Sequence, residues 1–498
     1  MLELRERLEV ERSNGADSGW PGLRSLPPRI LLVLLVVSLP LVNPWVRGDG
    51  VGYYAFARAL LIQRNLDFAP DYQHANQGFR EARLDSAGNP KEEFRTATGH
   101  LENHFTVGPA MLWAPFLLGA HVAVLLARAL GSDVPADGFS LPYLLAMAFG
   151  TVFYGFLALL LSYRVACRFV SGQWALAATI AVWWAGSLPV YMYFNPSWSH
   201  AHSAFAVALF FWYWLRTLDA RSTGQWLLLA LLAGLMLNVY YPNLLVLAVL
   251  IPEGLRAYLA ARNSRAGRAE TRRLLLQHAS FSLLTMLALL PTFLTKYVLY
   301  GGIFRTGYTP VTRWDWRSPS FLAVLFSANH GLFSWTPILL FSAAGLFLFW
   351  RNFPVVGSSV LAAVAGFYYF MASYPDWPGI SSYGNRFFIS LTVFFVLGLA
   401  TLLEAVAQKF ASRALASASL RVVLFVLVAW NLGLIFQWGA HLIPARGPVS
   451  WSEVARNQWQ VVPRQLAAEL RGFLFRRHQA LDEIEQRDIE QRKEQGLP

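Results

Sequence analysis

The chain has 498 residues, of which 55% are hydrophobic and only 14% are charged, with 41 basic against 29 acidic residues. Apolar runs of about the length that crosses a bilayer recur along it, so the composition excludes a soluble enzyme and indicates a polytopic membrane protein. The net charge of +12 does not indicate nucleic acid, because the bases lie in short links between apolar runs, and the single cysteine, Cys167, excludes an internal disulfide or a site of several thiolates.

The first apolar run, 30–46, ends at an acidic residue. The stretch 1–29 carries mixed charge and no small-residue cleavage site precedes the run's end, so we predict a cytoplasmic tail followed by a retained span. Asp49 then lies at the mouth of that span, with Gly48 and Gly50 on either side, which allow other groups to come close. A carboxylate at a membrane boundary indicates function. Capping of the following helix is the alternative interpretation.

The segment 48–140 is predicted to be a large external loop. Its apolar positions between Tyr53 and Ile62 recur at helical spacing, which predicts an amphipathic helix on the outer membrane surface. The apolar stretch 107–130 is interrupted by Pro109 and Pro115, and the count of crossings favours a re-entrant or surface-lying helix pair there. A full crossing is the alternative.

Basic links between the apolar runs set the predicted topology, because cytoplasmic loops carry an excess of Lys and Arg. We predict an all-α polytopic bundle of about eleven transmembrane helices, within a range of 10 to 13, with the N-terminus inside. The predicted spans are 30–46, 141–163, 174–194, 200–217, 226–240, 243–258, 275–298, 336–350, 354–373, 387–408 and 421–440. The membrane domain is therefore 30–440, with external loops 48–140 and 300–335. A polar tail, 441–498, is expected outside, with a charged surface helix at 481–487 that has no chemistry of its own.

Several basic residues are predicted on the outer side, where they are disfavoured in short loops. Lys296 precedes the second large loop, Arg305 lies within it, and Arg386 begins a late span. A phosphate carried by a lipid explains such a cluster, because Arg and Lys pair with phosphate at the membrane interface. Arg58, on the first-loop helix, is expected to frame the same headgroup. For Arg386, an interfacial anchor is the alternative.

Two histidines of the first loop have a spacing that would suit metal ligands on a helix. His100 and His104 are four residues apart with Glu102 between them, but Gly99 and the Gly108-Pro109 pair argue against a helix that would align them. We therefore predict no metal site, although a divalent metal stays open, and no soluble cofactor is indicated.

The order of short motifs resembles a known family. The motifs are Gly48-Asp49-Gly50-x-x-Tyr53-Tyr54, Asn103-His104-Phe105-x-x-Gly108-Pro109, Pro196-x-x-Ser199-His200 and Gly384-Asn385-Arg386-Phe387. Together they are similar to the GT-C glycosyltransferases, in particular the protein O-mannosyltransferase, aminoarabinose transferase and RgtA/B/C/D-like branch. The resemblance implies transfer of a sugar from a polyprenyl-phosphate donor, outside the membrane, with Asp49 at the catalytic centre. Many relatives have a second acid where this chain has 195–200 without one, which puts a two-carboxylate scheme in doubt.

These expectations combine into one hypothesis. Asp49 is expected to be the general base, and Lys296, Arg305, Arg386 and Arg58 to bind the donor phosphate. Contacts to substrate are expected at Tyr53, Tyr54, His104 and His200. The partners are the polyprenyl-phosphate sugar, membrane lipid, and an acceptor glycan, lipid or protein, with the site facing the periplasm or exterior of an inner (plasma) membrane. A transporter or lipid flippase, and a non-catalytic relative of the fold, are the alternatives.

Overall fold

The computed structural model describes residues 26–218, 221–410 and 412–494, and it divides the chain into two compact units, Met1–Leu39 and Pro40–Pro498. In the first unit the described residues form α2 (Leu26–Ser38), an apolar helix at the position of the predicted first span. The second unit contains everything else, including all of the motifs singled out above.

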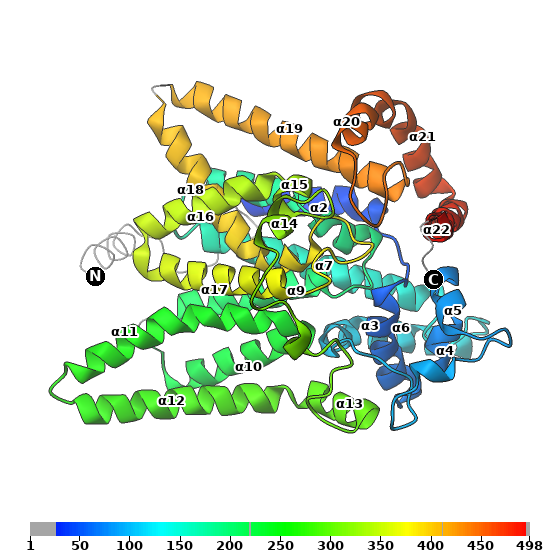
Figure 1. The fold of residues 1–498 in the computed structure, drawn as a ribbon, viewed down its shortest axis with the longest axis horizontal. Helices are drawn as coiled ribbons and strands as arrows, with labels where there is room; N and C mark the ends of the chain where they lie inside the picture. The colour runs from blue at the N-terminus through cyan, green and yellow to red at the C-terminus, as the bar shows by residue number, and fades with distance from the viewer. Residues whose placement is uncertain (1–25, 219–220, 411, 495–498) are drawn as a thin grey trace. The chain divides into compact units, whose positions relative to one another are not determined.

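The second unit is built from helices (Figure 1). The first loop contains α3 (Asp49–Arg58), a π-helical turn (Ala59–Gln63), α4 (Ala69–Gln73), α5 (Gln77–Arg83) and α6 (Gly108–Ala129). The body contains α7 (Leu141–Ala166), α8 (Gly172–Ala185), α9 (His200–Arg216), α10 (Thr223–Val239), α11 (Leu250–Arg262), α12 (Gly267–Ala288), α13 (Leu290–Tyr300), α14 (Phe321–Phe326), α15 (Leu332–Trp335), α16 (Ile338–Asn352), α17 (Pro354–Ser373), α18 (Thr392–Lys409) and α19 (Arg413–Gly439). Across the described residues, β-structure is limited to two isolated bridges. The predicted all-α fold is confirmed.

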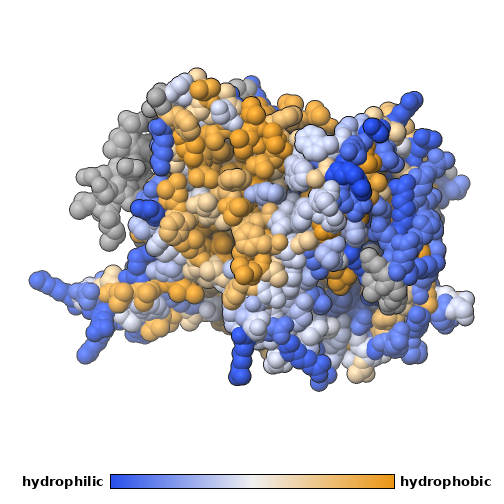
Figure 2. Space-filling model, turned by 45° about the horizontal axis from the view of Figure 1, so that its top comes forward, coloured by the Kyte–Doolittle hydropathy of each residue, from blue (hydrophilic) through white to orange (hydrophobic). Residues whose placement is uncertain are grey.

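Length and apolarity identify the helices that can cross a membrane. Among the described residues six helices qualify, or seven if the pair α12 and α13, bent by 47°, is one span. The six are Gly108–Ala129, Leu141–Ala166, Tyr241–Arg262, Pro354–Ser373, Arg386–Lys409 and Ala414–Gly439. Apolar side chains gather in a broad area on the face in Figure 2, with hydrophilic side chains to either side. The chain is thus a polytopic membrane protein, and the count of eleven crossings stays a prediction.

The basic links lie together at one end of the body helices. The turns from α11 to α12, from α16 to α17 and from α18 to α19 all lie toward the left of Figure 1, whereas α3 to α6 lie at the right. These turns carry Arg262, Arg351 and Lys409. Their assignment to the cytoplasmic side stays a prediction.

The stretch 107–130 does not form the expected helix pair. It is the single helix α6, which contains Pro115 without a break. The link that follows α6 returns to the first-loop helices, since Tyr54 donates from its hydroxyl to the Gly138 carbonyl at 2.5 Å and the rings of His74 and Phe139 stack at 3.9 Å. The turn between α6 and α7 therefore lies against α3 and α4.

The helix α3 was expected on the membrane surface, and this was wrong. Eight of its ten residues are buried. They pack inside the first loop: the Tyr54 and Trp113 rings lie 6.3 Å apart, and those of Phe56 and Phe68 lie 5.4 Å apart. Apolar burial on nearly every side of α3 fixes the helix in place, so its first residue, Asp49, has a defined position.

The tail is more than one surface helix. It forms α20 (Trp451–Gln460), α21 (Val462–Phe475) and α22 (Arg477–Glu494). On α22, Glu485 accepts hydrogen bonds from the Asn76 side chain at 2.9 Å and the Gly78 amide at 2.8 Å, and Asp488 pairs with Arg47 at 2.9 Å. The end of the chain is thereby joined to the segment that leads into Asp49.

Candidate functional site

Asp49 is the first residue of α3 and does not cap it. The N-cap is Gly48, whose φ of +54° lies in the left-handed region that favours glycine, and no side chain supplies a capping hydrogen bond. The backbone turns sharply there, with the Gly50 amide donating to the Arg47 carbonyl at 3.0 Å. The capping interpretation of Asp49 is therefore wrong, and its carboxylate is directed to another partner.

That partner is Arg386. The Asp49 Oδ2 and Arg386 Nη2 atoms lie 2.9 Å apart, with the carboxylate side chain 35% exposed and the guanidinium side chain 9% exposed. The guanidinium carbon lies 4.3 Å from the centre of the Trp198 ring, a cation–π contact. Trp198 in turn donates from its indole nitrogen to the Arg47 carbonyl at 3.0 Å. Three segments far apart in sequence thus converge on one ion pair, which joins an accessible acid to a buried base.

The turn 195–200 supplies one wall of the site. His200 is buried, with its ring 4.8 Å from that of Tyr191 and 6.1 Å from that of Tyr240. Several buried polar atoms nearby have no protein partner within the described residues: the Ser197 hydroxyl, His200 Nδ1, Asn385 Oδ1 and Arg386 Nε. Buried polar groups are normally paired, so this shell keeps hydrogen-bonding capacity that a bound molecule can use.

The two tyrosines of the first motif have different surroundings. The Tyr53 ring lies 4.5 Å from that of Phe105; burial and the Asp49 charge raise the pKa of its hydroxyl, against the effect of Arg386. Tyr53 is therefore a protonated donor beside the ion pair. Tyr54 turns away to the Gly138 carbonyl, so the structure does not bring it to the site.

His104 and Lys296 form a neighbouring group. The His104 ring lies 4.6 Å from that of Tyr308. Burial lowers the pKa of His104 to about 4, although the charge of Asp49 opposes this, so the imidazole is neutral near pH 7. Lys296 is fully buried and donates to the carbonyls of Asn103 and Phe105, both at 2.8 Å. Lys296 thus holds the segment that carries His104.

Arg58 and Arg305 are not brought to Asp49. Arg58 is buried and engages both oxygens of Asp71, at 2.7 and 2.5 Å, so its guanidinium already has a carboxylate partner. Arg305 is exposed and makes a hydrogen bond of 3.4 Å to the Tyr300 carbonyl. The expected shared cluster of four bases is therefore reduced to Arg386 at the carboxylate itself.

Two residues at the site were missed from the sequence. Trp198 was not singled out, although it lies inside the Pro196-to-His200 motif, and that position was the available signal. Tyr308 packs on His104 and Phe105, and burial, Tyr53 and Asp49 raise the pKa of its hydroxyl. No pattern in the second loop distinguished Tyr308 from other aromatic residues.

Within the described residues, no group of three or more His, Cys, Asp or Glu side chains is placed to hold a metal ion. His100 lies in a turn and contacts the Thr98 hydroxyl at 3.1 Å, so it does not share a helix face with His104.

The low pKa of His104 predicts a loss of stability in acid. The unfolded imidazole has a pKa near 6.5 and the folded one about 4, so folding releases the proton in between. The stabilisation is complete above pH 6.5 and is lost as the pH falls from 6.5 to 4. Thermal unfolding across this range is expected to show a smaller decrease for His104→Gln than for the wild type. Identical decreases would contradict the assignment.

Close packing around Gly50 predicts that an added side chain there lowers the stability of the fold. A Cβ atom there would lie 1.9 Å from the Ser197 hydroxyl oxygen and 2.6 Å from the Ser197 Cβ. Gly50→Ala is expected to destabilise the fold by about 1–3 kcal/mol, as overpacking does. Adding Ser197→Gly should restore most of this loss in thermal unfolding. Gly119→Ala, where the added atom meets nothing within 4 Å, is the matched control.

Comparison with known proteins gives little identity. No protein-family model and no curated protein matches the chain. Among solved structures it is similar to the archaeal oligosaccharyltransferase AglB from Archaeoglobus fulgidus, in complex with an inhibitory peptide and a dolichol-phosphate, with a TM-score of 0.44 and 14% sequence identity. The match covers 86% of this chain and 53% of that one, so the chain spans about half the length of AglB.

Proposed function

We propose that this chain is a membrane glycosyltransferase that moves a sugar from a polyprenyl-phosphate donor to an acceptor hydroxyl outside the membrane, with Asp49 as general base. The observation that carries the proposal is the contact between Asp49 and Arg386. In this pair a carboxylate, which can accept a proton, lies beside a guanidinium, which can bind phosphate.

The proposed reaction is a direct displacement at the anomeric carbon of the sugar. The acceptor hydroxyl attacks the anomeric carbon and gives its proton to Asp49, while the bond from that carbon to the phosphate oxygen breaks and its electron pair leaves with the phosphate. Direct attack of this kind inverts the anomeric centre. The side chain of Asp49 is 35% exposed, so an acceptor can reach it.

Arg386 suits the leaving phosphate. A guanidinium has five N–H donors in a planar fork, and Asp49 engages Nη2 while Nε has no partner among the described residues. One arginine can therefore hold the carboxylate and a phosphate together, and the negative charge that develops on the leaving group is stabilised without a proton. Arg58 is left out because Asp71 engages it, and Lys296 because it is buried and donates to two backbone carbonyls. Arg305 is left out because the structure does not bring it to Asp49.

Substrate contacts are assigned from the same geometry. Tyr53 offers a hydroxyl donor next to Asp49, and His200 and His104 offer imidazole nitrogens close by. We place these residues around the sugar or acceptor and assign Tyr54 to packing. The proposed location is an inner (plasma) membrane with the site on the periplasmic or exterior side, which the basic links at the other end support.

A transporter is less well supported. The buried charged side chains of the described residues lie in links, in first-loop and tail helices, or near helix ends: Arg58, Asp71, Arg221, Lys296, Arg386 and Glu485. A route through the bilayer calls for ionisable groups near its midplane. A reaction at the membrane surface fits the observed distribution better.

The test uses the full-length protein purified in detergent. It is incubated with a panel of radiolabelled polyprenyl-phosphate sugars and with membrane extract as the source of acceptor. Labelled product that forms with the wild type and is lost in Asp49→Asn supports the proposal. Product that persists in Asp49→Asn removes Asp49 as base, and the absence of product with every donor contradicts the enzyme assignment.

A further inference from the structure

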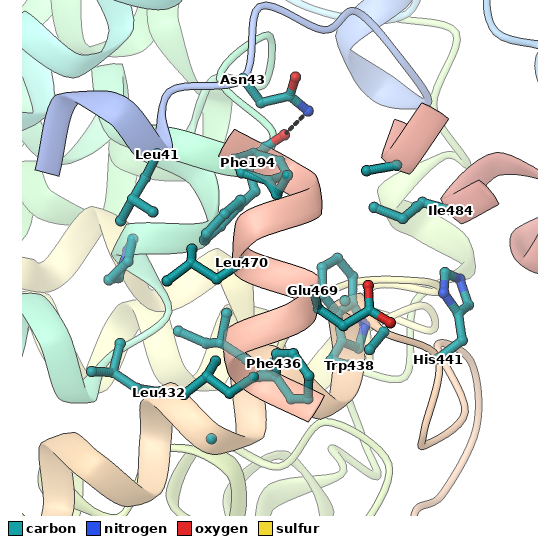
Figure 3. A pocket seen from close by; sticks show the side chains of 18 of the residues that line it. Leu41, Asn43, Phe194, Leu432, Phe436, Trp438, His441, Glu469, Leu470 and Ile484 are labelled. Carbon is teal, nitrogen blue, oxygen red and sulfur yellow. Dashed lines mark hydrogen bonds between the residues drawn. The ribbon is translucent and has the colours of Figure 1, made fainter. Parts of the chain in front are cut away.

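The tail helices enclose an apolar cavity of about 500 Å³ (Figure 3). This tail cavity is bounded by α19, by the helices α20 to α22 and by the link 41–47. Phe194 and Asn195, at the start of the turn 195–200, complete its lining. Its lining includes Leu41, Phe194, Leu432, Phe436, Leu470 and Ile484. The volume lies within the range of about 300–1,000 Å³ that is usual for small-molecule sites.

Charged residues border the cavity where α22 meets the link and the end of α19. Asp488 accepts from Arg47 at 2.9 Å and contacts His441 Nε2 at 2.6 Å. Arg487 and Glu483, also on the lining, lie 3.7 Å apart. The border therefore presents both signs of charge, while most of the remaining lining is apolar.

The apolar part of the cavity is continuous with a surface suited to lipid. Its wall α19 is one of the candidate spans, and it exposes the large apolar side chains Val422, Val423, Phe425 and Val426. On α21, Leu466 and Leu470 line the cavity and are also 43% and 40% exposed. These two leucines therefore join the cavity to the apolar outer surface.

We propose that the tail cavity binds a hydrocarbon chain of a zwitterionic membrane phospholipid, with the headgroup at the charged border. The apolar lining offers few hydrogen bonds, so the inserted part must be hydrocarbon. The headgroup's phosphate faces Arg47 and Arg487 and its ammonium faces Asp488 and Glu483, whereas these acids disfavour a purely anionic headgroup. The lipid binds between α19 and the tail and secures the link that leads to Asp49.

The test is native mass spectrometry of the delipidated full-length protein, titrated with phosphatidylethanolamine. Phosphatidylglycerol and a polyprenyl phosphate form separate arms. Ala480→Trp fills the cavity from α22, and Ala429→Trp narrows it from α19. Ala418→Trp makes the same change at an exposed position of α19 that does not line the cavity and is the matched control. Thermal unfolding identifies any variant that fails to fold.

One retained phosphatidylethanolamine is expected in the wild type and in Ala418→Trp, with at least tenfold weaker binding in whichever cavity variants fold. Arg487→Gln should weaken phosphatidylethanolamine binding as well, because the phosphate loses a partner. Tighter binding of either anionic lipid, no retained lipid in the wild type, or unchanged binding in both cavity variants would each overturn the proposal. None of these results depends on sugar transfer.

Discussion

Asp49→Asn is expected to lower the rate of sugar transfer by about 10²- to 10⁴-fold, the usual contribution of a general base. The amide has nearly the same shape and its oxygen still accepts a hydrogen bond from the charged Arg386 guanidinium, so the ion pair becomes a hydrogen bond to a neutral group without a cavity. What disappears is the ability to take a proton from the acceptor. The rate is measured with saturating labelled donor, so that a change in donor affinity does not contribute.

Two controls separate catalysis from folding. Asp133→Asn makes the same chemical change at an exposed acid in the link between α6 and α7, and it should keep full activity. Thermal unfolding of Asp49→Asn should stay close to that of the wild type. Asp49→Asn with full activity would show that the carboxylate serves only to hold Arg386, and a variant that fails to fold would assign Asp49 a structural role.

The fold could be predicted where one local signal decides it. Apolar runs of spanning length gave the helical membrane class, and basic links such as 262–268 gave one end of the bundle. The error over α3 has a tertiary cause. The sequence between Tyr53 and Ile62 reads as a surface helix by its spacing, but its polar positions are covered by α6 and by the link that returns from it. Such burial depends on tertiary contacts that no local pattern contains.

The site was predictable in part, because some of its residues carry a local signal of their own. Asp49 and Arg386 were each singled out because a charge at a span end is costly, and the structure pairs these two candidates with each other. Arg58 carried the same signal and was misassigned, because its partner Asp71 lies 13 residues away in a polar stretch without a motif. Sequence shows that a charge requires a partner but does not show whether the chain supplies that partner itself.

Breaking the pair of Arg58 and Asp71 is expected to be the most destabilising single change outside the proposed catalytic centre. The two side chains are only 4% and 3% exposed, and the guanidinium also lies 4.8 Å from the centre of the Phe139 ring. Arg58→Ala leaves the Asp71 carboxylate buried without a counter-charge, which costs about 3–5 kcal/mol. Thermal or denaturant unfolding of the purified protein measures this loss.

A double variant distinguishes stability from donor binding. Arg58→Met with Asp71→Leu removes both charges and keeps apolar volume, and buried pairs replaced in this way usually fold as well as the wild type. Because α3 then stays packed, Asp49 keeps its position, and transfer per folded molecule should be unchanged. A double variant that unfolds like the wild type but loses transfer would return Arg58 to the donor phosphate and contradict its assignment to the first-loop core.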